Sequence, residues 1–487
     1  MDNAPEKITA FEKRIKRQVI GKPHRFLAVV PLGFEQTLVD ELGFIGQERG
    51  DFQDSSLFDV EIASDGKVEF TTKLVEAWKA VAYSRVANRI LMHIADFKAE
   101  NFRELEKKAA EIPWELYLSD RRRVDIHVSC KHSRLYHSDA VAERLQKVIE
   151  GGSLPLAEAP KNEEIVLTQG LYVTLIDDRC TLWLDLAGEE LYKRGHERFV
   201  NDAPLKETIA AGMLFEAADR SKNNPITLID PMAGSGTFSL EAAYVANGLI
   251  PGKCRDFALK HQPAFKPATW NHIVNSANAN PNPSLRRNND SELSLQRNDN
   301  SMLSLQGNDD SILSLRRNEV TAAIKSPIQK IVTSDISERA VEIIQHNVEC
   351  CPLADIAPSA NAPTINPQLR DFFSYTAKEI ADLCGESSPV IVLNPPYGKR
   401  LNFDAPKLYT QIGKKLAELA RELAPLGKQL TVAILAPKDD SRPGSKYTCT
   451  ANLLHECPAL DPQQNSDAKN IVTSHGGLSL NAIIAKI

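Results

Sequence analysis

The sequence lacks long apolar runs, and this absence excludes most classes of membrane protein. No apolar run among the 487 residues approaches the roughly 20 residues that a bilayer-spanning helix needs. The amino-terminal segment 1–18 also contains no apolar core of the kind that a secretory signal requires. These absences predict a soluble, cytoplasmic protein without a membrane partner.

Closely spaced cysteines are also missing. The eight cysteines are scattered along the chain, with one adjacent pair and no C-x-x-C. A disulfide framework and a structural zinc site both need cysteines at short, repeated spacings. The sequence therefore predicts reduced thiols and no metal.

A basic net charge is absent as well. The formal net charge of −6 argues against a uniformly basic nucleic-acid-binding protein. Local basic clusters, which are enough to neutralise phosphates, occur between residues 13 and 25 and again from Arg121 to Arg123 with Lys131 and Arg134. Each cluster taken alone fits a solvated surface equally well.

The length exceeds what a single hydrophobic core usually holds, so two or three domains are expected. Short apolar runs and turn signals before residue 188 predict two mixed α+β modules. The predicted strands lie at 26–30, 58–62, 68–70, 124–128, 172–176 and 180–186, and the predicted helices at 33–42, 74–90 and 139–149. The predicted boundaries are a basic leader at 1–24, modules at 25–70 and 71–187, a linker at 188–205, and a last domain at 206–487.

In the last domain, apolar runs alternate with helical segments. The runs lie at 226–229, 331–333, 390–393 and 431–435, and a closing hairpin is expected between residues 471 and 487. This alternation predicts an α/β fold with a doubly wound parallel sheet. Residues 276–318 depart from it with a ten-residue Ser-Leu repeat, whose small apolar content predicts a weakly structured surface insertion without a catalytic role.

The most informative motif follows the apolar run 390–393 and consists of Asn394, Pro395, Pro396 and Tyr397. A buried parallel strand would place Asn394 at the sheet edge where α/β proteins bind ligands. Proline restricts the backbone of the residue before it and donates no N–H. Residues 394–397, called the Asn394 rim below, should therefore form a stiff segment rich in hydrogen-bond acceptors. The Asn394 carboxamide oxygen and a backbone carbonyl can accept hydrogen bonds from one exocyclic amino group, and Tyr397 can stack on a base.

A second motif links the predicted strand 226–229 to a predicted helix at 238–247. Its glycines would allow a ligand to approach the backbone closely, and the helix start adds free N–H groups. Alone, the motif fits a sterically required turn equally well. Its candidate cofactor-binding residues are Asp230, Pro231, Ala233, Gly234, Ser235, Gly236 and Thr237.

Two acids follow later strand ends. Asp335 is placed to hold ribose hydroxyls and Asp371 to accept from an adenine amino group, with Ile336 and Phe372 beside them. Thr208 is a further candidate, although a helix cap or a surface position explains it equally well. A glycine loop, two acids and the Asn394 rim in this order describe an S-adenosylmethionine-dependent amino-methyltransferase.

These motifs resemble those of a known family. The runs LYKRGHERFVNDAPLKETIAAGML (191–214), DPMAGSGTFSLEAA (230–243) and LNPPYGKRL (393–401) are similar to the THUMP-containing RNA guanine-N2 methyltransferases, most closely the bacterial ones acting on 23S ribosomal RNA. Segment 124–141 resembles their THUMP segment.

The resemblance implies a ferredoxin-like module at 25–70, a THUMP domain at 71–187 and a Rossmann-like methyltransferase domain at 206–487. It also implies S-adenosylmethionine as cofactor and large-subunit ribosomal RNA as partner. The RNA-contacting candidates are Lys131, Arg134, Tyr136 and His137. Some relatives carry a second methyltransferase domain, but a single glycine loop of this kind predicts one methylation activity.

Three alternatives remain open. A transfer-RNA guanine-N2 methyltransferase would share these motifs. An adenine-N6 methyltransferase acting on DNA or RNA would use the same rim, because the rim recognises an amino group and not a particular base. A non-catalytic RNA-binding assembly protein is the alternative outside enzymes.

Overall fold

The computed structural model describes residues 9–46, 58–119, 123–151, 168–200, 204–221, 224–278, 328–354, 363–397, 404–439 and 448–487. The predicted repeat insertion lies outside these residues from position 279 onward, as do Arg121 and Arg122. The chain forms two compact units: the first comprises residues 1–31, 45–195 and 252–275, and the second comprises 32–44, 196–251 and 276–487. In the part of the chain that is described, no helix is long and apolar enough to cross a membrane.

The first unit is built on one seven-stranded sheet in the order β2-β3-β1-β4-β7-β6-β5. Neighbouring strands are antiparallel except for the parallel pair of β5 and β6. The sheet joins strands from both predicted amino-terminal modules. Its strands are β1 (Pro23–Val29), β2 (Asp59–Ser64), β3 (Lys67–Lys73), β4 (Arg89–Lys98), β5 (Arg123–Lys131), β6 (Thr168–Ile176) and β7 (Arg179–Asp185).

Helices α3, α4 and α5 pack against strands of this sheet. The prediction of a helix over 74–90 is wrong in its last part, because α3 ends at Tyr83 and β4 begins at Arg89. At Ser84 the backbone is extended, and the Ser84 hydroxyl accepts a hydrogen bond from the Ala87 N–H (3.0 Å), which competes with further helical turns. The helices are α1 (Ala10–Ile15), a π-helix at Lys16–Ile20, α3 (Leu74–Tyr83), α4 (Phe102–Ala110), α5 (Ser138–Gly151) and α8 (Pro267–Asn278).

A second seven-stranded sheet, in the order β10-β9-β8-β11-β12-β14-β13, forms the second unit. The first five strands are parallel, as the alternating pattern predicted, and β13 and β14 add the predicted antiparallel hairpin. The strands are β8 (Ile226–Asp230), β9 (Ile328–Asp335), β10 (Gln368–Leu369), β11 (Ser388–Leu393), β12 (Thr431–Pro437), β13 (Lys469–His475) and β14 (Leu478–Lys486).

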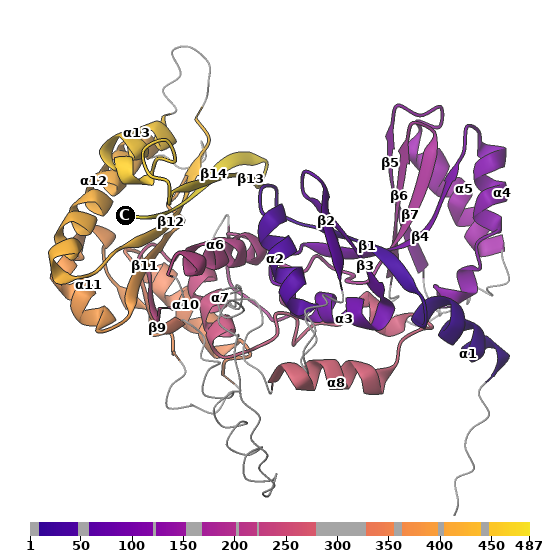
Figure 1. Ribbon diagram of the computed structural model, residues 1–487, viewed down its shortest axis with the longest axis horizontal. Helices are drawn as coiled ribbons and strands as arrows, with labels where there is room; N and C mark the ends of the chain where they lie inside the picture. The colour runs from indigo at the N-terminus through magenta and orange to yellow at the C-terminus, as the bar shows by residue number, and fades with distance from the viewer. Residues whose placement is uncertain are drawn as a thin grey trace, which may run out of the picture. The chain divides into compact units, whose positions relative to one another are not determined.

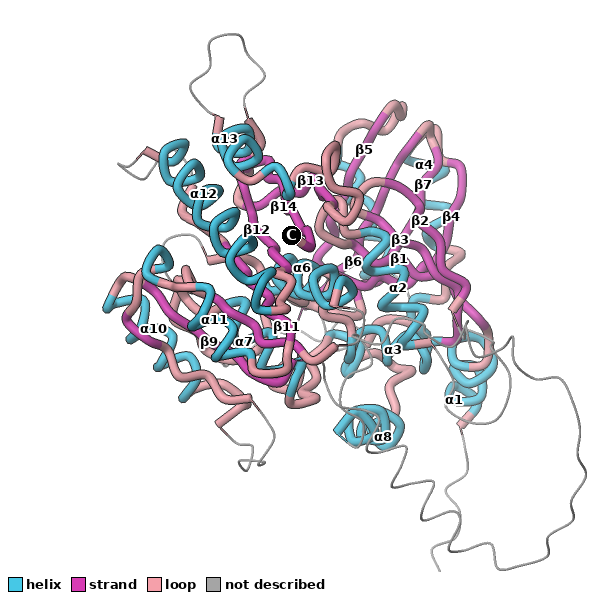
Figure 2. Tube along the Cα trace, turned by 60° about the vertical axis from the view of Figure 1, so that its left-hand side comes forward, coloured by secondary structure: helices cyan, strands magenta, loops and turns pink. Residues whose placement is uncertain are grey.

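Helices cover both faces of this second sheet (Figures 1 and 2). On one face α11, α12 and α13 form a buried core with the strand residues Ile229, Ile391 and Ile434. Helices α6, α7 and α10 pack against the same sheet through β8, β9, β12 and β14. The helix bounds are α2 (Glu35–Ile45), α6 (Glu207–Arg220), α7 (Thr237–Ala246), α10 (Glu338–Glu349), α11 (Ala377–Cys384), α12 (Ala405–Leu423) and α13 (Cys449–Glu456).

The two units exchange segments, which the predicted domain boundaries do not anticipate. Residues 32–44, most of them in α2, belong to the second unit, where the Thr37 hydroxyl donates to the buried Glu216 carboxylate (2.7 Å). Residues 252–275 belong to the first unit, where the Arg255 guanidinium donates to the carbonyls of Glu190 and Lys193 (2.8 Å each). The predicted last domain is therefore interrupted by a segment that completes the first unit.

Candidate functional site

The candidate site lies at the carboxyl ends of four adjacent strands, β10, β9, β8 and β11. The Gly234 N–H donates to Asp335 Oδ2 (2.9 Å), and the Ala233 N–H donates to the Ser334 carbonyl (3.1 Å). The Arg370 N–H donates to the Asp335 carbonyl (2.8 Å), which holds the segment leading to Asp371 against the end of β9. The sheet thus brings together the glycine loop and the two acids, although they are far apart in sequence.

The glycine loop, residues 231–236, depends on two left-handed residues. Gly234 has a φ of +59° and Gly236 a φ of +80°, a region that side chains other than glycine rarely adopt. A Cβ at Gly236 would lie 3.2 Å from Ile344 of α10, whereas a Cβ at Gly234 would meet no described atom within 4 Å. Gly236 is therefore required for packing, and Gly234 borders open space where a ligand can approach the backbone.

Asp230 ends β8 beneath this loop and is buried. Its Oδ2 accepts hydrogen bonds from the Ser239 hydroxyl (2.8 Å) and the Ser239 N–H (3.3 Å). Its Oδ1 is buried and has no hydrogen-bond partner in the described part of the chain. The pKa of Asp230 is raised to about 7, chiefly by burial; the Ser239 hydrogen bonds oppose the shift, and the nearby Asp335 charge contributes to it.

The buried Asp230 carboxyl predicts a pH-dependent stability. Its pKa is raised above the unfolded value of 3.8, so the neutral form favours folding and this advantage is lost as the pH rises from about 4 through about 7. Asp230→Asn should remove this dependence, worth up to about 4 kcal/mol. Urea unfolding at pH 5 and at pH 8 measures this dependence. Between pH 5 and pH 8, the free energy of unfolding should fall more in the wild type than in Asp230→Asn. Equal decreases in the two proteins would contradict the prediction.

The rim predicted from the sequence stands at the end of β11. Asn394 follows the fully buried Leu393, and the strand pairs with β8 on one side and β12 on the other. Asn394 Oδ1 is buried and accepts no hydrogen bond from any described residue. Pro395 is buried, Pro396 is exposed and Tyr397 is partly buried. A buried, unsatisfied acceptor is costly, so its presence indicates a ligand that donates to it.

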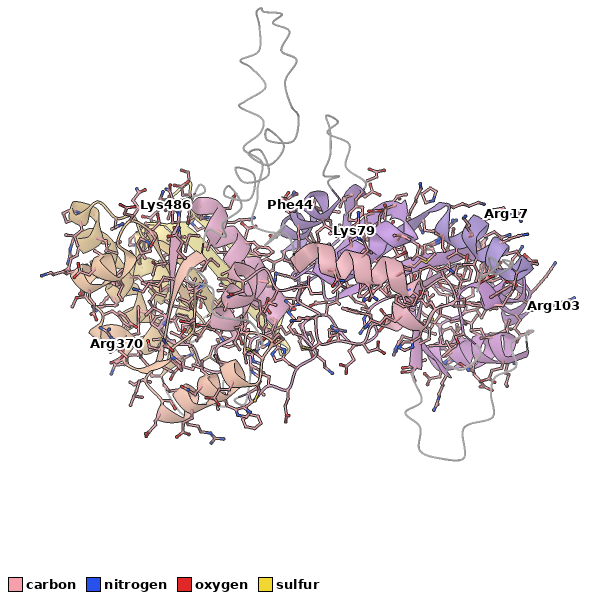
Figure 3. The ribbon with its side chains drawn as sticks, turned by 90° about the horizontal axis from the view of Figure 1, so that it is seen from below. Arg17, Phe44, Lys79, Arg103, Arg370 and Lys486 are labelled. Atoms are coloured by element: carbon pink, nitrogen blue, oxygen red, sulfur yellow. The ribbon has the colours of Figure 1, made fainter. Side chains whose placement is uncertain are left out.

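The two acids also shape the turns in which they lie. Asp335 Oδ1 accepts from the Ser337 N–H (2.9 Å), and Asp371 Oδ1 accepts from the Phe373 N–H (3.0 Å). Ile336 is 72% exposed beside Asp335, whereas the Phe372 side chain is buried in the core. Phe372 is therefore confined to backbone contacts with any ligand at this edge. Arg370, labelled in Figure 3, donates to both oxygens of Glu379 (2.6 Å each).

Thr208 lies in the first turn of α6 and is fully buried. The alternative interpretations of this residue as a surface residue or a helix cap are wrong, because the helix already begins at Glu207 with Lys206 as its N-cap. A position bordering the cofactor stays a prediction.

Sequence reasoning missed two residues that hold the glycine loop. Arg198 donates through Nη2 to Ser235 Oγ (3.0 Å) and Thr237 Oγ1 (2.5 Å), and its Nη1 pairs with Glu207. Asn347 of α10 donates to the Ser235 carbonyl (3.1 Å). Residues 188–205, predicted as a linker, therefore include a segment packed against the loop. Neither Arg198 nor Asn347 carries a local sequence signal for this role.

The predicted RNA-contacting residues lie in the first unit, at the end of β5 and in the segment that follows it. Tyr136 is 68% exposed, and its ring centroid lies 4.1 Å from that of the exposed His137. Arg134 is not a free cation, because its guanidinium pairs with Glu100 and lies near Asp178 (3.7 Å). Lys131 is exposed at the end of β5. Their contacts with RNA stay a prediction.

No group of three or more His, Cys, Asp or Glu side chains that could hold a metal ion is present among the described residues. The cysteines are free thiols, and burial raises the pKa of Cys180 and Cys449 to about 12.

Residues 194–429 match the family described as "RMKL-like, methyltransferase domain". Among curated proteins, the chain is 24% identical over 360 residues to the "Ribosomal RNA large subunit methyltransferase K/L" of Psychromonas ingrahamii, an alignment that covers 72% of this chain and 40% of that protein. It is 26% identical over 403 residues to YpsC of Bacillus subtilis, provisionally named as an RNA methyltransferase, with 82% of this chain and 86% of YpsC covered.

Among solved structures, the chain resembles the protein SMU.472, provisionally named as a methyltransferase and crystallised with SAH. The TM-score is 0.64 at 20% identity, and the match covers 95% of this chain and 98% of that one. This similarity confirms the predicted α/β fold with a Rossmann-like domain. The THUMP assignment of residues 71–187 stays a prediction. The chain spans less than half the length of the Psychromonas ribosomal RNA methyltransferase.

Proposed function

We propose that the chain transfers a methyl group from S-adenosylmethionine to the N2 amino group of a guanine in large-subunit ribosomal RNA. The match of residues 194–429 to the family described as "RMKL-like, methyltransferase domain" supports this proposal. The observation that carries the proposal is the buried Asn394 Oδ1, which accepts no hydrogen bond from the described residues and lies at the same sheet edge as the glycine loop. The ribosomal RNA substrate is supported by the name of the Psychromonas relative.

The residues at this edge fit S-adenosylmethionine. The open space beside Gly234 admits a ligand against the backbone, and Asp230 Oδ1 is a buried acceptor lacking a partner in the described chain. Asp335 and Asp371 offer carboxylates for ribose hydroxyls and the adenine amino group. The cofactor's amino-acid ammonium group matches the chemistry of Asp230, since a cation would relieve the cost of its buried carboxylate.

In this proposal the protein chiefly aligns a poor nucleophile. S-adenosylmethionine supplies a methyl group that its sulfonium already activates, so orientation is the main catalytic requirement. Asn394 Oδ1 and the Pro395 carbonyl accept hydrogen bonds from the two amino N–H groups, which turns the nitrogen lone pair toward the methyl group. Tyr397 stacks on a base removed from its helix. The proton leaves after methyl transfer, so no strong base is needed.

The decisive experiment combines cofactor binding with identification of the product. The purified chain should bind S-adenosylmethionine in calorimetry and transfer tritiated methyl groups to ribosomal RNA that was transcribed without modifications. Mass spectrometry of the digested RNA should locate the label as N2-methylguanosine in 23S RNA. N6-methyladenosine, or label confined to transfer RNA, would overturn the assigned base or substrate. Absence of cofactor binding would overturn the activity.

A further inference from the structure

The segment that carries Asp371 is a short turn between β10 and α11. Asp371 caps a single 3₁₀ turn at Phe372–Ser374, where its Oδ1 accepts from the Phe373 N–H (3.0 Å). Its Oδ2 accepts no hydrogen bond from a described residue, which leaves that oxygen for a ligand. Hydrogen bonds in so short a 3₁₀ turn have poor geometry, so the direction of this carboxylate depends on groups outside the turn.

The Arg370 side chain supplies this outside support. Its guanidinium donates to Glu379 of α11 through both Nη1 and Nη2 (2.6 Å each). Its Nε donates to the Ser374 hydroxyl (3.1 Å), and that hydroxyl donates to the Asp371 carbonyl (2.7 Å). The hydrogen bonds from Arg370 lower the pKa of Glu379, so both partners are charged at neutral pH. One side chain therefore connects the turn to α11.

A buried tyrosine fixes the orientation of the guanidinium. Arg370 Cζ lies 3.7 Å from the Tyr375 ring centroid, within the range of a cation–π contact. Tyr375 is buried, and its hydroxyl forms a hydrogen bond with Ser334 Oγ of β9 (3.0 Å). The carbonyl of the same Ser334 accepts from the Ala233 N–H of the glycine loop (3.1 Å). Arg370 thus packs on a ring that is itself bonded to the strand beside the glycine loop.

The contribution of Arg370 to overall stability should be small. Its side chain is 22% exposed and that of Glu379 is 40% exposed, and ion pairs this accessible to water contribute little to the free energy of unfolding. Two parallel hydrogen bonds to one carboxylate and a stacked ring nevertheless impose a definite geometry on the guanidinium. We therefore expect Arg370 to affect the position of Asp371 more than the stability of the fold.

We propose that Arg370 is a positioning residue that fixes the Asp371 carboxylate and so makes the site selective for the adenine of S-adenosylmethionine. The inference rests on the proposed function, in which Asp371 accepts from the adenine 6-amino group. A carboxylate only accepts hydrogen bonds, so in a fixed position it binds an amino group and repels a 6-oxo group. A carboxylate that can shift reaches the neighbouring N1–H of a 6-oxo purine, and the selectivity falls.

The test measures, by calorimetry on the full chain, the affinities for S-adenosylhomocysteine and for its deaminated analogue S-inosylhomocysteine, which carries a 6-oxo group. Wild type should bind the adenosyl ligand about 10²-fold more tightly, because the analogue places an acceptor against the carboxylate. Arg370→Ala should lower this ratio of affinities roughly tenfold. Arg370→Lys should lower it nearly as much, since lysine keeps the charge but not the planar, bidentate contact.

The matched control is Arg421→Ala, because Arg421 of α12 also lies near a glutamate of the second unit (Glu422, 3.7 Å). This variant should keep the wild-type ratio. Glu379→Gln should lower the ratio, and combining it with Arg370→Ala should add little, since the two side chains act as one unit. Thermal unfolding identifies loss of fold. If Arg370→Ala fails to fold, Arg370→Lys and Glu379→Gln decide the question.

An unchanged ratio in the folded variants would overturn this role of Arg370, as would an equal loss of affinity for both ligands, which is the mark of a merely structural contact. A wild-type protein that binds the two ligands equally well would also overturn it. In these three cases the proposed function stands, because the chain still binds the adenosyl ligand. A wild-type protein that binds neither ligand would overturn the proposed function and this inference together.

Discussion

Asn394→Ala should lower kcat by about 10²- to 10³-fold while changing the affinity for S-adenosylmethionine little. Its Oδ1 is buried without a partner in the described part of the chain, which marks it as an acceptor reserved for a ligand. In the proposed mechanism it aligns the amino nitrogen, and losing one preorganised polar contact to a reacting group costs effects of this size. Single-turnover methylation at saturating cofactor and RNA measures the loss.

Two controls separate this role from general damage. Asn394→Asp keeps oxygen acceptors at the same position, so it should retain more activity than Asn394→Ala. Calorimetry of S-adenosylmethionine with each variant tests whether the cofactor site is intact. A variant that loses cofactor affinity but keeps wild-type turnover at saturation would show that Asn394 serves the cofactor and not the substrate base.

The parts of the site that could be predicted from the sequence are those set by local pattern. The apolar run 390–393 is buried because a central parallel strand is covered on both faces, and its burial places Asn394 at the sheet edge. The glycine loop was predictable because glycines between a predicted strand and a predicted helix indicate a tight turn. In the structure, Gly234 and Gly236 adopt the left-handed conformations that such a turn requires. In each case neighbouring residues in sequence determine the geometry.

The parts that could not be predicted depend on contacts between distant residues. Arg198 reaches Ser235 across 37 positions, and Asn347 binds the Phe199 carbonyl across 148 positions. Nothing in either local pattern distinguishes these side chains from surface residues. Helix α2 was predicted correctly as a helix, but its packing in the second unit depends on complementary groups such as Thr37 and Glu216, which are 179 positions apart.

Asp335→Ala should weaken binding of S-adenosylmethionine by about 10- to 100-fold. The Asp335 carboxylate accepts from the Gly234 N–H through Oδ2 and from the Ser337 N–H through Oδ1, so it fixes the glycine loop to the end of β9. Its remaining lone pairs are free to accept ribose hydroxyls. Losing a charged acceptor that makes such contacts costs about 1.5–3 kcal/mol, which corresponds to this range of affinity. Calorimetric titration with S-adenosylmethionine measures the change.

The matched control is Asp461→Ala, because Asp461 Oδ1 also accepts a backbone N–H two residues later (Gln463, 2.9 Å) in an exposed turn. This variant should bind the cofactor like wild type. Asp335→Asn should lose less affinity than Asp335→Ala, since it keeps one acceptor for the loop. If Asp335→Ala binds S-adenosylmethionine with unchanged affinity, the carboxylate only caps its turn, and the ribose must be held by other groups at this sheet edge.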